Sequence, residues 1–342
     1  MALTSRKPFK PSAALAAAFV CATALAGCGA ATSDSVDPNP ASTGSHSPNQ
    51  SVTPSNVAFL NNPSIQDVID IGNYTLNLTG KPFFSNVTLF AANIDGTDPN
   101  AAILALNNYF NALLETPTGL AAVGALQAKG VKVQLGLLPN HQNAGWSCPM
   151  TTAGAAVLGN AIVALLNTYK LDGVAIDDEY SNCAPVNNPP PPSPSSMYAV
   201  AQAIKTNPDF GGKILSKAVF NDAQFFVSPT NMADVLTQGY QMSYIGANVG
   251  LLDPYKAAGM ASSALWLGLS PQYNNAQDAG SLAASVKNAS YAGMMVWSPN
   301  TSLTNLSDGE AYYTSIAQGQ SNADAKVTFV PTVSSPSGSP GP

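Results

Sequence analysis

Charged residues are scarce in this chain of 342 residues. They make up 9 %, with 13 Lys and Arg against 19 Asp and Glu and a formal net charge of −6. No basic cluster occurs beyond the N-terminus, so the cationic surface that nucleic-acid binding requires is missing. After residue 28 no apolar run approaches the roughly 18 residues of a membrane span, which argues against a later transmembrane helix.

Residues that serve several common catalytic sites are also few. There are only two histidines, His46 and His141, and four cysteines. A zinc site needs several such ligands together, so we expect no metal, and no motif indicates another cofactor. A Ser–His–Asp triad would have to use His141, and the G-x-S-x-G motif that often carries its serine is absent.

Residues 1–27 are predicted to be a lipoprotein signal peptide. Three basic residues precede the apolar run "AALAAAFVCATALA", and "LAGC" at 25–28 resembles a bacterial lipobox. That pattern predicts cleavage before Cys28 and lipid on its sulfur, which would anchor an exported protein to a membrane without spanning it. An ordinary secretory signal cut nearby is the alternative.

Composition divides the rest of the chain into three parts. Residues 28–54 are mostly small, polar and proline-rich, so we expect a disordered tether, and 331–342 repeat that composition as a tail. Residues 55–330 carry the apolar runs of a folded domain, for which we expect a monomer.

Short apolar, mostly β-branched runs alternate with Ala/Leu-rich stretches of helical spacing across this domain. Helices are expected at 101–115 and 154–169. Eight strands separated by helices predict a (β/α)8 TIM barrel. The alternative, a doubly wound sheet, would usually carry a glycine-rich phosphate loop, which is absent. The strands are expected at 56–60, 86–94, 131–138, 173–177, 213–220, 239–244, 263–269 and 292–297.

Four of the 19 acidic residues fall within eight positions, in "LDGVAIDDEY" at 171–180. The run ends the fourth strand, and the carboxyl ends of barrel strands carry the chemistry. Strand alternation predicts that Ala175, Asp177 and Glu179 point into the barrel, while Val174 and Ile176 face the helices. Two carboxylates in one site push one pKa upward, as a general acid at neutral pH requires.

The same acids have two other interpretations. They could cap the next helix, or they could bind a cation. A calcium loop of the EF-hand type would need ligands at alternate positions around a glycine and a distal Glu, and that pattern is absent. Catalytic carboxylates are therefore favoured.

The segment "DGVAIDDE" resembles the D-G-x-D-x-D-x-E signature of glycoside hydrolase family 18. "LDGVAIDDEY" is especially similar to the endo-β-N-acetylglucosaminidases of the endoglycosidase H type, which have Asp where this chain has Ala175. The resemblance covers about 55–320, through "GNYTLNL", "LFAANI", "KVQLGLLPNHQNAGW", "GYQMSYIG" and "MMVWSP" in the same order.

The resemblance implies a retaining, substrate-assisted hydrolysis of the β-1,4 bond in the N,N′-diacetylchitobiose core of N-glycans. Glu179 would be the general acid. Asp177 would orient the substrate acetamide, and Tyr244 would hydrogen-bond its oxygen. A chitinase with the same catalytic residues is the first alternative. A non-catalytic glycan-binding protein is the second, because of Ala175.

Five further positions are predicted to bind substrate. Asn140, His141 and Gln142 follow the third strand and line the cleft or only form its turn. Asn221 follows the fifth strand. Trp297 is a stacking floor for the sugar or an ordinary core residue.

Cys148 and Cys183 remain as a pair after the signal and the lipobox have accounted for the other two cysteines. Export to an oxidising compartment favours a disulfide between them. They follow the third and fourth strands, so adjacent loops bring them to the same face of the barrel. Two unpaired buried thiols are the alternative.

Overall fold

The structure is a computed structural model that describes residues 55–179, 181, 183 and 192–331. The predicted signal peptide, Cys28, the tether and residues 332–342 of the tail lie outside the described residues. In the described part of the chain, no helix is long and apolar enough to span a membrane.

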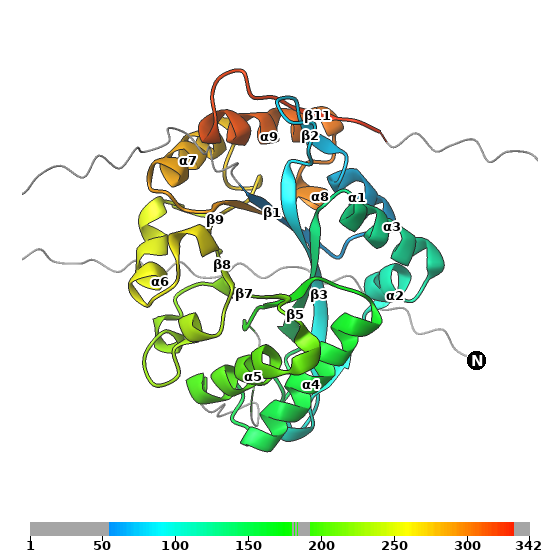
Figure 1. Cartoon of the computed structure of the whole chain (residues 1–342), viewed down its shortest axis with the longest axis vertical. Helices are drawn as coiled ribbons and strands as arrows, with labels where there is room; N and C mark the ends of the chain where they lie inside the picture. The colour runs from blue at the N-terminus through cyan, green and yellow to red at the C-terminus, as the bar shows by residue number, and fades with distance from the viewer. Residues whose placement is uncertain (1–54, 180, 182, 184–191, 332–342) are drawn as a thin grey trace, which may run out of the picture. The chain divides into compact units, whose positions relative to one another are not determined.

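Eight parallel strands close into a barrel, which confirms the predicted (β/α)8 fold. Each strand pairs with the next, and β1 pairs with both β3 and β10 to complete the ring. Helices surround the ring (Figure 1). The barrel strands are β1 (Asn56–Asn61), β3 (Phe84–Asp95), β5 (Lys132–Pro139), β6 (Gly173–Ile176), β7 (Ile214–Val219), β8 (Gln238–Gln241), β9 (Leu265–Leu269) and β10 (Gly293–Trp297).

The α-helices follow the barrel strands as the alternation predicts, except after β7, where the chain forms only the short 3₁₀ turns Ala223–Phe225 and Met232–Asp234 before β8. The α-helices are α1 (Ile65–Ile71), α2 (Asn108–Leu114), α3 (Pro117–Ala128), α4 (Thr152–Thr168), α5 (Pro194–Thr206), α6 (Asp253–Ala257), α7 (Ala276–Asn288), α8 (Pro299–Ser302) and α9 (Leu306–Gln320). Outside the barrel, β2 (Tyr74–Leu76) and β11 (Val327–Phe329) form an antiparallel pair.

One predicted helix is wrong over its first half. Residues 103–105 form β4 (Ile103–Ala105), which pairs antiparallel with the end of β3, and α2 begins only at Asn108. The reason is local: β3 extends beyond the barrel and offers an open edge to β4. The Asn107 side chain then caps α2 by accepting hydrogen bonds from the Tyr109 and Phe110 backbone N–H groups. The helix expected at 154–169 is present as α4.

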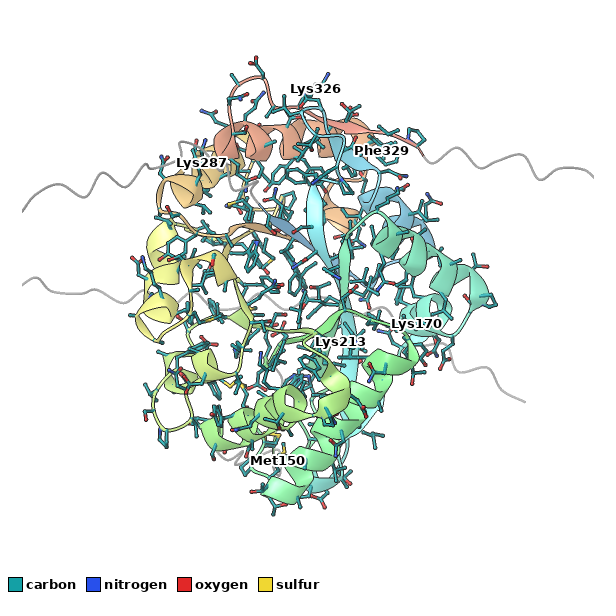
Figure 2. The ribbon with its side chains drawn as sticks, viewed as in Figure 1. Met150, Lys170, Lys213, Lys287, Lys326 and Phe329 are labelled. Carbon is teal, nitrogen blue, oxygen red and sulfur yellow. A yellow bond between two sulfur atoms is a disulfide. The ribbon has the colours of Figure 1, made fainter. Side chains whose placement is uncertain are left out.

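The apolar side chains of the barrel form two cores, as strand alternation requires. Val174 and Ile176 belong to the outer core between strands and helices, whereas Ala175 lies inside the ring and is 1 % exposed. Aromatic side chains, including Phe59, Tyr240 and Trp266, accompany Ala175 inside. Side chains therefore fill the interior of the ring (Figure 2).

Candidate active site

Asp177 and Glu179 lie where β6 ends at the mouth of the barrel. The last ladder bond of this strand runs from the Asp177 N–H to the Leu137 carbonyl, at 3.2 Å. The Asp177 side chain is only 4 % exposed, whereas Glu179, two residues further on, is exposed at the mouth. The two acids therefore differ in access to solvent although they belong to one site.

Both carboxyl groups favour their protonated form more than an isolated acid does. Burial, with the neighbouring negative charge of Glu179, raises the pKa of Asp177 to about 7. Although Glu179 is exposed at the mouth, the surrounding protein shields part of its carboxyl from water, and this desolvation raises its pKa. The positive charge of Lys217 opposes both changes. A carboxyl that keeps its proton near neutral pH is what general-acid catalysis needs.

Tyr244 shares this electrostatic environment. Burial, and then the charges of Asp177 and Glu179, raise the pKa of Tyr244 well above its ordinary value, so its hydroxyl stays protonated and able to donate. Its ring stacks on Trp297, with centroids 6.2 Å apart and an interplanar angle of 18°. The Asn274 amide donates to the Tyr244 carbonyl at 3.0 Å and fixes the backbone there.

Two supporting residues for Tyr244 were missed at the sequence level. One is Asn274; the other is Gly268 on β9. A Cβ on Gly268 would lie 1.9 Å from the Gln241 carbonyl oxygen and 3.1 Å from the Tyr244 ring. Glycine is therefore required where β8 and β9 meet behind the tyrosine. The glycine inside the apolar run "LWLGL" was the signal for such a close approach.

Lys217 is a third residue that sequence reasoning missed. It is 3 % exposed on β7, forms an ion pair with Asp222, and donates to the Ala218 carbonyl at 2.8 Å. The Tyr255 hydroxyl donates to the other Asp222 oxygen at 2.8 Å. A lysine inside the apolar strand "ILSKAV" is the sequence feature that marks this buried pair.

The other two acids of the run have structural partners. Asp172 accepts from Gln127, Lys132 and the Val133 N–H at 2.7, 2.9 and 3.0 Å. Burial alone would raise the pKa of Asp172, but these bonds outweigh it and hold the pKa below its ordinary value. Asp178 accepts from the Ser181 hydroxyl. No three His, Cys, Asp or Glu side chains among the described residues gather so that they could hold a metal ion.

The predicted substrate-binding residues occupy different surroundings. Asn140 and His141 are exposed at the end of β5, where His141 has φ +55°. The Gln142 side chain accepts from the Gly96 N–H at 3.0 Å, so it joins the β5 and β3 loops. Asn221 is exposed and borders a cavity outside the strand ring.

Trp297 combines features of both its predicted roles. It is half-buried at the end of β10 and packs edge-on against Phe90 with centroids 5.0 Å apart. Its stacking on Tyr244 places it within the barrel mouth. Contact with a sugar stays a prediction.

Cys148 and Cys183 form a disulfide, with Cα atoms 4.9 Å apart. Both cysteines are buried. The bond connects the loops that follow β5 and β6, next to the segment that carries the acids. It therefore restrains one wall of the barrel mouth.

Comparison with known proteins finds relatives that are similar to this chain in sequence. No family model matches the chain. Endo-beta-N-acetylglucosaminidase F1 of Elizabethkingia meningoseptica is 28 % identical over 269 residues, which cover 75 % of this chain and 76 % of the relative. Over three quarters of its length the chain is thus similar in sequence to an endo-β-N-acetylglucosaminidase. A second such glycosidase, from a Flavobacterium species, is 34 % identical over 165 residues, about half of each chain.

Several solved structures share the fold of this chain. EndoBT-3987 of Bacteroides thetaiotaomicron, in complex with a Man9GlcNAc2Asn substrate, has a TM-score of 0.63 at 20 % identity, covering 81 % of this chain and 67 % of that one. The complex of the same protein with a Man5GlcNAc product has a TM-score of 0.60 at 21 % identity. In that comparison this chain spans 62 % of the length of the longer protein. A putative chitinase A of Streptomyces coelicolor has a TM-score of 0.57 at 20 % identity. The match covers 79 % of this chain and 99 % of that one.

Proposed function

We propose that this chain hydrolyses the β-1,4 bond between the two N-acetylglucosamines of an N-glycan core by a retaining, substrate-assisted mechanism. One observation carries the proposal: Asp177, Glu179 and Tyr244 share one electrostatic site at the carboxyl mouth of the barrel. The homology to endo-β-N-acetylglucosaminidases supports the substrate class.

The site divides the chemistry among three side chains. The Glu179 carboxyl donates its proton to the glycosidic oxygen as the bond to the anomeric carbon breaks. The acetamido oxygen of the substrate attacks that carbon and forms an oxazolinium ion, whose positive charge the Asp177 carboxylate stabilises. The Tyr244 hydroxyl donates to the acetamido oxygen and sets its line of attack. The Glu179 carboxylate then takes a proton from a water molecule that attacks the anomeric carbon and opens the oxazolinium ring.

Substitution of the proposed acid tests this mechanism. Glu179→Gln preserves shape and removes the titratable proton, so kcat should fall by about 10²–10⁴-fold or more. Glu115→Gln, at the end of α2 on the outside of the barrel, is the matched control. Release of glycans from a high-mannose glycoprotein, followed by mass spectrometry, provides the assay. Near wild-type release by Glu179→Gln would remove Glu179 from the mechanism.

Ala175 supports a second candidate, a glycan-binding protein without turnover. The inward side chain below Asp177 is a methyl group, so Asp177 has no carboxylate there to hold its rotamer. We expect a slower enzyme rather than an inactive one, and Ala175→Asp should raise turnover or shift the pH profile. If the wild type binds a glycan without cleaving any tested substrate, and Ala175→Asp confers cleavage, the binding function replaces the enzymatic one. A chitin oligomer in the same assay tests the chitinase alternative.

We further propose that the protein is exported and anchored by lipid on Cys28. The lipobox supports this proposal. Detergent-phase partitioning of the full chain expressed in a bacterium tests it, since Cys28→Ser should move the protein to the aqueous phase.

A further inference from the structure

A cavity of about 480 Å³ lies beside the proposed active site, between the loops that follow β7 and β8. This volume falls within the roughly 300–1,000 Å³ of small-molecule sites. The mechanism above does not use it. The residues that line it include Asn221, Asp222, Phe226, Gln241, Ser243 and Tyr255.

The cavity and the barrel mouth lie on opposite sides of one strand end. Tyr240, Met242 and Tyr244 belong to the inner core of the barrel, whereas the alternate residues Gln241 and Ser243 line the cavity. A ligand in the cavity is thus separated from the catalytic tyrosine by the thickness of a single strand. An extended substrate could occupy both sides of the rim.

The lining combines apolar faces with a few buried polar groups. Phe226 and Tyr255 are 7 % and 6 % exposed and meet edge to face, with ring centroids 4.9 Å apart. Asp222 and Gln241 are 5 % and 2 % exposed. The Asp222 carboxylate is fixed by Lys217 and by the Tyr255 hydroxyl, yet each of its oxygens can accept another hydrogen bond.

This chemistry suits a neutral sugar. The apolar side chains pack against C–H faces, while the carboxylate and amide groups hydrogen-bond hydroxyls. Among the described residues that line the cavity, none is Lys, Arg or His, and the one charged group is the Asp222 carboxylate, which is paired with Lys217 behind it. A sialylated or phosphorylated ligand would therefore meet no cation there.

We propose that this cavity binds a neutral hexose of the glycan arm while the chitobiose core lies in the barrel mouth. The inference rests on the proposed function, because it assigns this hexose to the same substrate. It also predicts that the cavity determines which arms the protein prefers.

Filling the cavity tests the proposal. Ala257→Trp on α6 and Ala223→Trp on the β7–β8 loop project from exposed positions on different elements that line it. Ala121→Trp, at an exposed position on α3, is the matched control. The measurement is the ratio of kcat/KM for a Man9GlcNAc2Asn substrate to kcat/KM for the same substrate trimmed to its trimannosyl core.

Each filled variant should lower this ratio about tenfold, the lower end of the discrimination that one contacting group provides, and Ala121→Trp should not change it. An unchanged ratio in folded Ala257→Trp and Ala223→Trp proteins would overturn the proposal. If the wild type cleaves neither substrate, the proposed function fails instead. Calorimetric titration with intact Man9GlcNAc2Asn then tests whether the cavity binds the glycan arm. Equal affinity of wild type and Ala257→Trp in that titration would also overturn it.

Discussion

The buried Asp177 carboxyl should make the protein less stable as the pH rises, and Asp177→Asn should remove that effect. The pKa of this group is about 7 in the fold, against an ordinary value of 3.8 for an aspartate carboxyl. A raised pKa means that the folded state binds the proton more tightly than the unfolded chain does. The cost of Asp177 to stability is therefore absent below pH about 4, grows between pH 4 and 7, and is complete above pH 7.

The two pKa values set the size of the effect. At 1.36 kcal/mol per pKa unit, their separation corresponds to about 4 kcal/mol at pH 8. Asp177→Asn keeps the shape and an acceptor for the Asp178 N–H, so we expect it to be more stable than wild type by up to this amount at pH 8. At pH 4 the two proteins should be nearly equal in free energy of unfolding. If Asp177 stabilises the oxazolinium ion as proposed, the variant should lose turnover at every pH.

Denaturant unfolding of the wild type and Asp177→Asn, with the disulfide intact, measures the difference at each pH from 4 to 8. Asp178 and Glu179 also titrate and are present in both proteins, so the difference reports Asp177 together with its electrostatic coupling to these two neighbours. Because the charge of Glu179 contributes to the raised pKa, the gain should be smaller in a Glu179→Gln background. A stability difference that is constant from pH 4 to 8 would refute this account of the site.

Two further predictions concern the supports of the site. Replacing Cys148 and Cys183 by serine frees a loop with a sequence separation of 35 and should lower the free energy of unfolding by about 3–4 kcal/mol in the chain-entropy model, and added reductant should abolish the difference from wild type. Gly268→Ala should lower both kcat and the melting temperature, since its methyl group must displace the Gln241 carbonyl and the Tyr244 ring. Gly124→Ala on α3, where no atom lies within 4 Å of the added Cβ, should keep wild-type kcat and be slightly more stable. Wild-type kcat in Gly268→Ala would show that the position of Tyr244 does not depend on this glycine.

The barrel could be predicted because its signals are local and repeated. All eight predicted strands are present. Each barrel strand is buried on both faces, so it has the same continuous apolar sequence pattern at every position in the ring. The start of α2 failed because tertiary structure decided it: β3 extends past the barrel and pairs with β4, which no periodicity within 101–115 records. A composition rich in Ala and Leu could not show that this edge existed.

The proposed catalytic residues could be predicted because they are close in sequence or belong to a motif. Asp177 and Glu179 are two residues apart, and strand alternation alone places them on one face. Gly268 and Lys217 were missed because their importance comes from neighbouring strands. In each case the sequence shows an unusual residue in an apolar strand, a glycine or a lysine. Such a residue indicates a close contact or a buried partner, but it does not identify the neighbouring group.

The geometry also clarifies what Ala175 changes. An aspartate at this position would add a like charge and a hydrogen-bond partner below Asp177. The pKa of Asp177 is nevertheless about 7 without it, because burial and Glu179 already raise the pKa against the opposing charge of Lys217. Around the methyl group, aromatic side chains of the inner core occupy the space. The alanine therefore removes a partner that would orient Asp177, whereas the raised pKa of this carboxyl comes from its burial and from the charge of Glu179.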